Sequence, residues 1–162
     1  MIMQTETTPS ANLKIWNRLQ HLPLGKWMFS RAVCLKAPYF RTIHPAIEEL
    51  RPGYCRVTAP NRRGVHNHLG TFHAIASCNM AELAGGMMTD ATIPSTHRWI
   101  PVGMTVEYKA QARTAVTAIA HLHSIPEFGS EPIDLTVPVD VSDESGNIFV
   151  TARITMRITP RR

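Results

Sequence analysis

Residues 71–90 read TFHAIASCNMAELAGGMMTD, and this stretch decides the fold of the chain. It is too long for a turn and is rich in helix formers and small residues, with alanines at positions 74, 76, 81 and 84. Its larger apolar residues are Ile75, Met80, Leu83, Met87 and Met88. They cover so much of a helical circumference that the helix should be buried, and not merely rest on a surface. The sequence therefore predicts a long helix at the centre of a domain.

The residues on either side of this helix alternate between apolar and polar, as half-buried strands do. One strand is predicted over residues 50–59, interrupted early by Pro52 and Gly53. Residues 98–111 alternate most cleanly, and we expect one face of this long antiparallel strand to carry Ile100, Val102, Met104, Val106 and Tyr108. Further strands are predicted over residues 116–122, 133–141 and 148–158, the last two joined as a hairpin by the turn residues 143–147. The expected order is strand, long helix, four strands.

Length and charge narrow the class of protein. With 162 residues, of which 44% are hydrophobic, the chain can bury a core of its own and is predicted to form one domain. Seventeen Lys and Arg against twelve Asp and Glu give a net charge of +5, which favours anionic partners such as phosphorylated ligands, nucleic acid or anionic membranes. The basic residues are spread along the chain, so nucleic-acid binding is not favoured.

The cysteines and the longest apolar stretches indicate in which cellular compartment the protein is expected. Cys34, Cys55 and Cys78 are an odd number without C-x-x-C spacing, so neither a disulfide framework nor structural zinc is predicted. No stretch approaches about 18 apolar residues, and the first residues do not resemble a secretion signal. We therefore expect a cytoplasmic protein without a membrane span.

The first third of the chain is basic and helical in pattern. Between Thr7 and Ile47 there is no acidic residue, whereas six basic residues alternate with apolar ones: Lys14, Arg18, Lys26, Arg31, Lys36 and Arg41. Ser10 is a suitable cap for a first helix, and Pro38 should close a second. Two interpretations compete: helices packed on the edge of the domain, which we favour, and an amphipathic anchor that touches a membrane. We divide the chain into a helical extension, residues 1–48, and a main domain, residues 49–162.

Glu82 is the only carboxylate between His73 and Asp90, halfway along the predicted central helix. A buried carboxylate is costly unless it has partners or a chemical task. The alternative is a narrow polar stripe that faces water, formed by Asn79, Glu82, Gly86 and Thr89, in which Glu82 is simply solvated. The helical pattern alone leaves both interpretations open.

A polar, glycine-punctuated loop, GVHNHLGTFH at residues 64–73, runs into the start of this helix. Free amides at a helix N-terminus attract negative charge, so a carbonyl placed there would be polarised by the Ala74 amide and stabilised as an oxyanion. His66, His68 and His73 are an alternative metal-binding set, but no nearby Cys or acid completes the ligands, and no metal is predicted.

The pattern Asn67-x-x-Gly70-x-x-His73, followed by Glu82, resembles the loop-and-helix motif of the PaaI-like hotdog thioesterases. In that family an Asn or Gln precedes the histidine of an H-G-G motif by six residues, and an Asp or Glu follows it by nine, as here. The resemblance covers roughly residues 49–160. It implies an α+β hotdog fold, an antiparallel sheet wrapped around a long central helix. The N-terminal helical extension makes the chain more similar to uncharacterised hotdog proteins that share such an extension.

The resemblance also implies an acyl-CoA thioesterase. Glu82 would activate water or attack the thioester carbonyl, the Ala74 amide would hold the oxyanion, and His73 and Asn67 would orient the substrate. The family's substrate-binding positions correspond here to Gly70 and Thr71, and weaker candidates for the CoA phosphates are Arg62 and Arg63. CoA enters as part of the substrate, and no separate cofactor is implied. The family implies a homodimer or a dimer of dimers, with Glu82 acting on a ligand held by the partner's loop.

One departure from the family motif keeps a second function open. Ala74 and Ile75 stand where the family has two glycines, and their side chains would crowd a ligand at the helix start. The alternative is therefore a non-catalytic acyl-CoA binding protein. A hydratase is not favoured, because His68 stands where the hydratase type has an aspartate. We further expect residues 10–45 to cover the acyl end of the pocket, since four large apolar residues there need a surface to bury against: Trp16, Trp27, Met28 and Phe29.

Overall fold

The computed structural model describes residues 8–161. Its helical elements are α1 (Ala11–Leu19), α2 (Gly25–Lys36), the 3-10 helices η1 (Pro38–Ile43) and η2 (Arg63–Val65), and the long helix α3 (Ala74–Thr92). Its strands are β1 (Ala46–Arg51), β2 (Tyr54–Ala59), β3 (His97–Tyr108), β4 (Val116–His121), β5 (Ile133–Asp143) and β6 (Ile148–Pro160).

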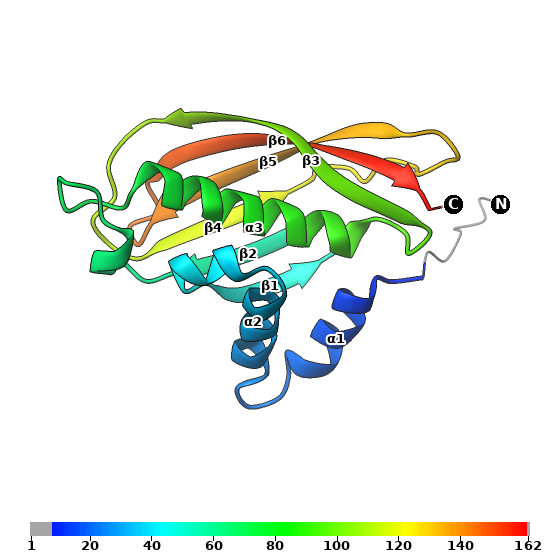
Figure 1. Ribbon diagram of the computed structural model, residues 1–162, viewed down its shortest axis with the longest axis horizontal. Coiled ribbons are helices and arrows are strands. Elements are labelled where there is room, and N and C mark those ends of the chain that lie inside the picture. Colours follow the sequence, from blue (N-terminus) through cyan, green and yellow to red (C-terminus); the bar gives the residue numbers. More distant parts are fainter. Residues whose placement is uncertain (1–7, 162) are drawn as a thin grey trace.

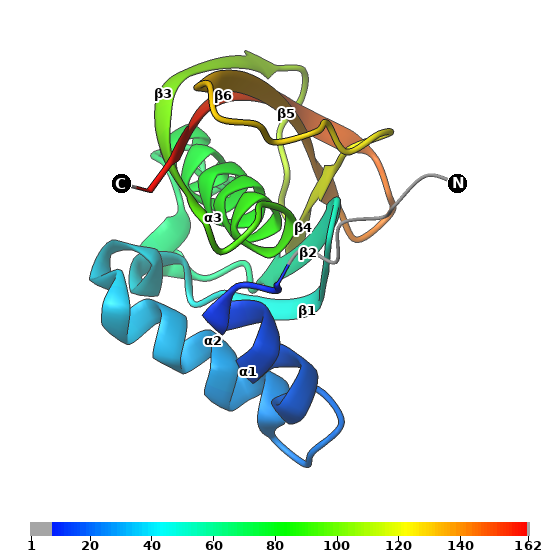
Figure 2. The ribbon, with the colours of Figure 1, turned by 90° about the vertical axis from the view of Figure 1, so that its right-hand side faces the viewer.

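Six strands form one antiparallel sheet in the order β1-β2-β4-β5-β6-β3, and α3 lies against its concave face (Figure 1). Viewed along α3, the sheet curls around the helix (Figure 2). Thirteen of the nineteen residues of α3 are buried, so the helix is covered on most of its circumference, as the sequence predicted. This is the hotdog architecture that the sequence predicted, with the helix, the later strands and the β5–β6 hairpin in the expected order.

The core lies between α3 and the concave face of the sheet. Val57, Ala118, Val139 and Ile154 come from four different strands and are almost fully buried beneath the helix. Two glycines allow α3 to approach closely: a methyl group at Gly85 would lie 3.0 Å from Ile154, and one at Gly86 would lie 2.9 Å from the Trp99 ring. Close packing here fixes the rotation of α3, and so which of its side chains stay outside.

The single strand predicted over residues 50–59 is wrong. The chain forms two strands there, β1 and β2, which pair as a tight hairpin in which Arg51 lies opposite Tyr54. Gly53 has φ +74, a left-handed conformation that lets the chain reverse after Pro52. The predicted interruption was in fact a complete turn, and the strand before it begins at Ala46.

The prediction that five residues of β3 share one face is wrong for Ile100. A bulge between Pro101 and Gly103 leaves Val102 without a partner on β6 and shifts the alternation by one residue. Ile100 therefore lies opposite Arg157 on the convex face, whereas Met104 lies opposite the buried Ile154 on the concave face. Ile100, Val102 and Met104 are all exposed, because β3 is a free edge of the sheet in the single chain.

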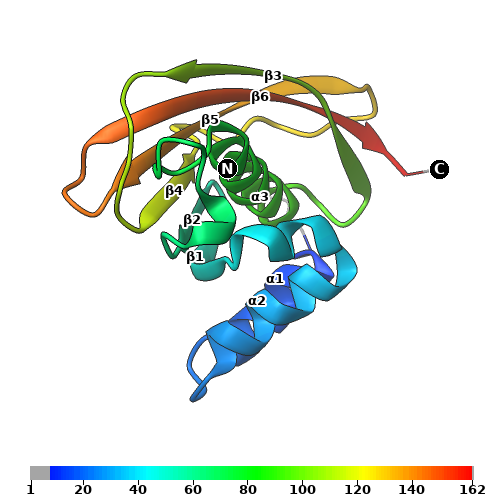
Figure 3. The same ribbon diagram turned by 60° about the vertical axis from the view of Figure 1, so that its left-hand side comes forward.

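The N-terminal helices form a hairpin that covers the other edge of the sheet, as favoured from the sequence (Figure 3). Ser10 caps α1, accepting a hydrogen bond from the Leu13 amide at 3.2 Å. The Ser30 hydroxyl of α2 accepts one from the Ile47 amide of β1 at 2.8 Å. No helix within residues 8–161 is long and apolar enough to span a bilayer.

The expected burial of four large side chains in this hairpin is only half correct. Trp16 and Phe29 are buried, with their rings edge to face and centroids 5.2 Å apart. Trp27 and Met28 are exposed instead. Met28 lies opposite the buried face of α2, which Phe29, Ser30 and Cys34 form, and Trp27 lies beside that face.

We expect Trp16→Ala to lower the free energy of unfolding by about 3 kcal/mol, the lower end of the range for a buried tryptophan. The lower end applies because the buried Trp16 Nε1 has no hydrogen-bond acceptor among residues 8–161. Removing the indole therefore also removes the free-energy penalty of burying an unpaired N–H group. Trp27→Ala is the matched control and should change stability by no more than about 0.5 kcal/mol. Urea unfolding of both variants measures this, and equal losses would contradict the packing of α1 on the domain.

Candidate active site

The loop before α3 is held in shape by Asn67. Its side-chain Oδ1 accepts hydrogen bonds from the amides of Leu69 and Thr71 at 2.9 and 3.1 Å, and its Nδ2 donates to Thr71 Oγ1 at 2.8 Å. Gly70 completes the turn with φ +71, a conformation that side chains disfavour. Asn67 therefore positions the loop, and its side-chain oxygen is already used by two backbone amides.

Thr71 is buried, and its hydroxyl accepts the hydrogen bond from Asn67 Nδ2. Its side chain therefore supports the loop from within. The loop is also fastened at its base. The Phe72 amide donates to the Ala112 carbonyl at 2.9 Å, and the His73 amide donates to the Val65 carbonyl at 2.8 Å. These bonds fix the direction in which α3 begins.

His73 is the N-cap of α3. Its Nδ1 accepts a hydrogen bond from the Ile75 amide at 3.0 Å, so a neutral imidazole carries its proton on Nε2, on an exposed ring. The Ala74 amide, the first of the helix, has no acceptor among residues 8–161. A donor N–H on His73 and a free amide on Ala74 thus stand together at the positive end of the α3 dipole.

Glu82 lies on the one stripe of α3 that stays exposed, together with Ile75 and the half-buried Cys78. The wholly solvated polar stripe considered from the sequence is wrong, because Asn79, Gly86 and Thr89 are buried. On one side of the stripe, Asn79 Nδ2 donates to Thr42 Oγ1 of η1 at 3.2 Å.

On the other side of the stripe lies β3. Cys78 Sγ is 3.2 Å from Tyr108 Oη, and Trp99 packs over Gly86. Glu82, between these two contacts along the helix, is exposed and makes no hydrogen bond or ion pair within residues 8–161. Its carboxylate is therefore free for a ligand or a partner.

Glu82 and the Ala74 amide do not form one site within a single chain. Eight residues separate them, which places them about 12 Å apart along the helix axis. A carboxylate that delivers water and an amide that holds an oxyanion must both lie within about 3 Å of one reacting carbonyl group. The structure thus places the two groups on the same helix but at separate positions.

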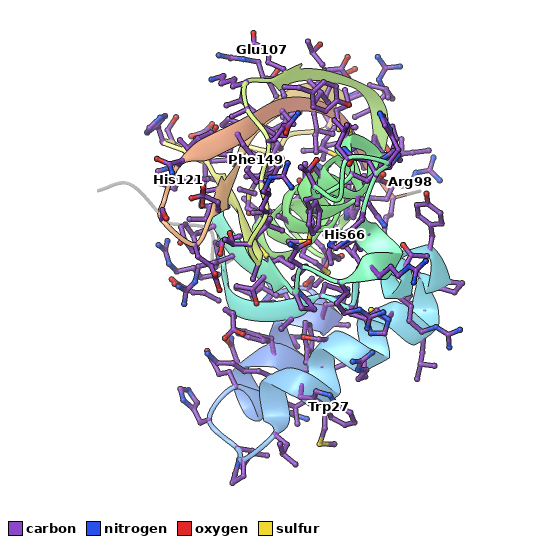
Figure 4. The ribbon with its side chains drawn as sticks, turned by 90° about the vertical axis from the view of Figure 1, so that its left-hand side faces the viewer. Trp27, His66, Arg98, Glu107, His121 and Phe149 are labelled. Atoms are coloured by element: carbon purple, nitrogen blue, oxygen red, sulfur yellow. The ribbon has the colours of Figure 1, made fainter. Side chains whose placement is uncertain are left out.

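A cavity of about 260 Å³ adjoins the helix start, between η1 and the loop. Its walls include Tyr39, Thr42, His66, His73, Ile75 and Asn79. Figure 4 looks onto this end of the molecule, with His66 beside the start of α3. A larger cavity, about 430 Å³, lies at the opposite end of α3 and contains none of the predicted site residues.

Sequence reasoning missed Tyr39 and Thr42. They precede the main domain in the chain and reach the helix start only through the tertiary packing of η1. The only signal in the sequence was the closeness of residues 38–43 to the end of the basic segment, which says nothing of their position in space.

Three arginines surround the loop. Arg62 and Arg63 are exposed at the start of η2, as the sequence suggested for phosphate contacts. Burial first, and the nearby Arg62 charge second, hold the pKa of His44 below its ordinary value. The third arginine, Arg113, was missed from the sequence; its guanidinium donates to the Leu69 carbonyl at 3.4 Å.

The histidines of the loop do not form a metal site in the described part of the chain. Residues 8–161 contain no cluster of three His, Cys, Asp or Glu side chains able to hold an ion. His66 Nε2 is engaged with Asn61 Oδ1 at 2.8 Å, and His73 Nδ1 with the Ile75 amide. The alternative metal hypothesis therefore has no geometric support.

Comparison with known proteins identifies the family. The chain belongs to the family described as "Domain of unknown function (DUF4442)", a hotdog-like domain family whose model matches residues 25–158. No curated protein matches the chain.

Solved structures show the same fold. A crystal structure described as genomics APC5556 is 44% identical, with a TM-score of 0.80, covering 93% of this chain and 99% of that one. A protein from Pseudomonas aeruginosa described as a probable thioesterase is 23% identical, with a TM-score of 0.74, covering 86% and 97%. A thioesterase from Haemophilus influenzae is 15% identical, with a TM-score of 0.66, covering 75% and 82%. These neighbours establish the hotdog fold.

The role of Asn67 in the loop gives a test. Asn67→Ala leaves two backbone amides and a buried hydroxyl without their partner, and it should cost about 1–3 kcal/mol and speed amide exchange at Leu69 and Thr71. Asn67→Asp keeps both accepted bonds and should retain most of the protection. Hydrogen exchange followed by mass spectrometry measures this, and an aspartate variant as damaged as the alanine variant would contradict the assigned geometry.

Proposed function

We propose that this protein hydrolyses acyl-CoA thioesters at a site shared by two copies of the chain. The observation that carries the proposal is the presence on α3 of a helix-start amide, at Ala74, and an exposed carboxylate, Glu82, neither of which has a partner within residues 8–161. Their separation of about 12 Å is too large for one site but suits two subunits that each supply one group. The thioesterase descriptions of structural neighbours from Pseudomonas and Haemophilus support the same reaction class.

The open edge of the sheet supports the dimer. The β1 edge is covered by α2, whereas the twelve residues of β3 have no neighbouring strand on their outer side within residues 8–161. Along it, Ile100, Val102, Met104 and Tyr108 are exposed by 41–60%. A long, apolar, uncovered edge strand readily pairs with another strand. In the proposed dimer, two β3 strands pair about a two-fold axis and bring the two α3 helices alongside each other in opposite directions.

The two-fold symmetry predicts the position of the axis. For Glu82 of one helix to lie level with Ala74 of the antiparallel partner, the axis must pass level with the residue midway between them, which is Cys78. Cys78 already faces β3 through its contact with Tyr108. The proposed dimer therefore has one Cys78 close to its symmetry mate and two equivalent sites on either side.

The chemistry follows from this arrangement. The thioester carbonyl accepts hydrogen bonds from the Ala74 amide and the His73 Nε2–H, while Glu82 from the second chain removes a proton from water. The water oxygen bonds to the carbonyl carbon, and the negative charge moves to the carbonyl oxygen at the helix start. The intermediate then collapses, the carbon–sulfur bond breaks, and the proton passes to the departing thiolate, giving a carboxylic acid and free CoA.

Surrounding side chains suit the two ends of the substrate. Arg62, Arg63 and Arg113 offer guanidinium groups near the loop for the CoA phosphates. In this proposal the cavity beside Ile75 and Tyr39 receives part of the acyl group. Residues of the extension would thereby contribute to acyl selection.

A second candidate function, acyl-CoA binding without hydrolysis, rests on Ala74 and Ile75. Both carry side chains at the point of closest approach to the carbonyl, and Ile75 forms a wall of the adjoining cavity. Ala74→Gly decides between the two functions. If the methyl restrains catalysis, Ala74→Gly should raise kcat. If wild type and variant both bind acyl-CoA but hydrolyse neither aliphatic nor aromatic thioesters, the binding function replaces the enzymatic one.

Glu82→Gln tests the base. It keeps the shape of the side chain and removes its basicity, so kcat should fall by roughly 10²–10⁴ while acyl-CoA binding changes little. Glu131→Gln, an exposed residue of the loop before β5, is the matched control and should leave turnover unchanged. Steady-state kinetics on a panel of acyl-CoA esters measures both, and wild-type turnover in Glu82→Gln would contradict the mechanism.

Cross-linking tests the position of the axis. A short bis-maleimide should join two chains through Cys78, whereas burial raises the pKa of Cys34 and Cys55 and keeps them from reacting. Cys78→Ser should abolish the covalent dimer seen on denaturing gels. A protein that is dimeric in sedimentation but gives no Cys78 cross-link would place the axis elsewhere.

A further inference from the structure

Helix α2 is apolar on both of its faces. Its inner face buries Phe29 and Cys34 against the domain, as expected for a packed helix. Its outer face carries a second apolar stripe at helical spacing, Leu24, Met28 and Leu35, with exposed fractions of 74%, 52% and 78%. Trp27 flanks this stripe and is 56% exposed. A soluble helix normally has polar residues on its outer face, so this stripe requires an explanation.

Nearly half of the exposed large apolar residues lie on this hairpin and on η1. Of the fifteen large hydrophobic side chains that are exposed in residues 8–161, seven belong to the segment from Ile15 to Tyr39. The proposed dimer gives an explanation for those on β3 but not for these. Figures 1 and 3 place the hairpin on the side of the molecule opposite β3.

The positive charge of the protein gathers on the same segment. Residues 7–47 hold six of the seventeen Lys and Arg and none of the twelve Asp and Glu. The remainder of the chain has eleven basic residues against twelve acidic ones, so the segment accounts for the whole net charge of +5. Lys26 is paired with Glu48 at 3.5 Å, but no carboxylate partner occurs within residues 8–161 for the other five.

The basic side chains border the apolar stripe. Arg31 lies on the outer side of α2, with its guanidinium carbon 5.7 Å from the centre of the Trp27 ring. Lys36 is exposed at the end of the same helix, and Lys14 and Arg18 are exposed one helical turn apart on α1. Aromatic and aliphatic groups bordered by cations, of which only Lys26 is paired with a carboxylate within residues 8–161, suit an interface of acyl chains and anionic headgroups.

The tip of the hairpin exposes an apolar side chain. Leu24, the residue before α2, has a left-handed conformation with φ +61, although most of its side chain is in water. Gly25 follows because a methyl group there would lie only 1.8 Å from the Leu19 carbonyl oxygen. In Figure 4, Trp27 lies at the end of the molecule farthest from Glu107 on β3.

We propose that the outer face of α2 and the tip of the α1–α2 hairpin dock on the surface of an anionic phospholipid bilayer. The apolar stripe enters the boundary between headgroups and acyl chains, and Lys14, Arg18, Arg31 and Lys36 contact phosphate groups. The β3 edge lies on the opposite side of the molecule and stays free. The protein is thus a peripheral membrane protein that needs no spanning segment, and this association is independent of whether the site hydrolyses thioesters.

The test uses the full chain and vesicles, measured by co-sedimentation. Vesicles that contain phosphatidylglycerol should bind the protein, pure phosphatidylcholine vesicles should bind it at least about tenfold more weakly, and added salt should release it. The double variant Met28→Ser/Leu35→Ser should lose at least about tenfold in affinity for the anionic vesicles. Ile148→Ser, at an apolar residue that is 45% exposed at the start of β6, is the control and should bind as wild type.

Fluorescence identifies the inserted residue. Trp16 is fully buried and Trp99 is partly buried, so a blue shift on adding anionic vesicles should come from Trp27 and disappear in Trp27→Phe while binding persists. Circular dichroism confirms that each variant is folded. Equal binding to neutral vesicles, no binding at all, or unchanged binding in the double variant would overturn the proposal. So would a double variant that changes the oligomeric state without lipid, because the stripe would then be an interface between copies of the chain.

Discussion

The burial of α3 is the constraint on which the rest of this structure depends. A helix with apolar residues around most of its circumference must be covered on several sides at once, and one flat sheet cannot do this. The sheet therefore curls around it, and Gly85 and Gly86 let the helix sink against Ile154 and Trp99. Once α3 is fixed in this rotation, Ile75 and Glu82 are its exposed residues, with the half-buried Cys78 between them. The exposed position of Glu82 is thus a consequence of packing.

The two edges of the sheet are treated differently, and this difference links the fold to the function we propose. The extension covers β1 through α2, with Ser30 accepting a hydrogen bond from the Ile47 amide. On the other side, no element of residues 8–161 covers β3, and β3 borders the exposed stripe of α3 through the contact of Tyr108 with Cys78. A partner that pairs with β3 would cover the stripe as well. Formation of the dimer would then complete the site in the same step. The α1–α2 hairpin, which covers the β1 edge, leaves its outer face free for the proposed contact with a bilayer.

Local pattern predicted much of this fold because the strongest signals are local. The helix within residues 71–90, the β5–β6 hairpin and the cap at Ser10 each follow from spacing or from one residue type. The Val102 bulge was missed because clean alternation continues through it, and only the pairing with β6 shows the shift. The β1–β2 turn was read as an interruption, although Gly53 is the residue type that a two-residue turn requires.

The candidate site was predicted less completely, because side-chain roles depend on contacts that are distant in sequence. Motif spacing singled out Asn67, His73 and Glu82, and all three lie on the loop and helix where they were expected. The spacing did not show that the Asn67 oxygen is taken by backbone amides, or that Tyr39 and Thr42 reach the helix start. Trp27 was expected to be buried because it is large and apolar. Its burial depends instead on which side of α2 packs against β1, and the sequence of α2 alone does not show this.

A site that takes its amide from one chain and its carboxylate from the other can be restored by mixing two inactive variants. Ala74→Pro removes the amide proton at the first helical position, where proline is well tolerated, and His73 already has the extended backbone that precedes a proline (φ −68, ψ 137). Glu82→Gln removes the base. Each variant alone should be nearly inactive. After mixing and subunit exchange, half of the dimers should be mixed and carry one intact site of two, which restores about a quarter of wild-type activity. A mixture that stays as inactive as its components, although mass spectrometry shows mixed dimers, would contradict the shared site.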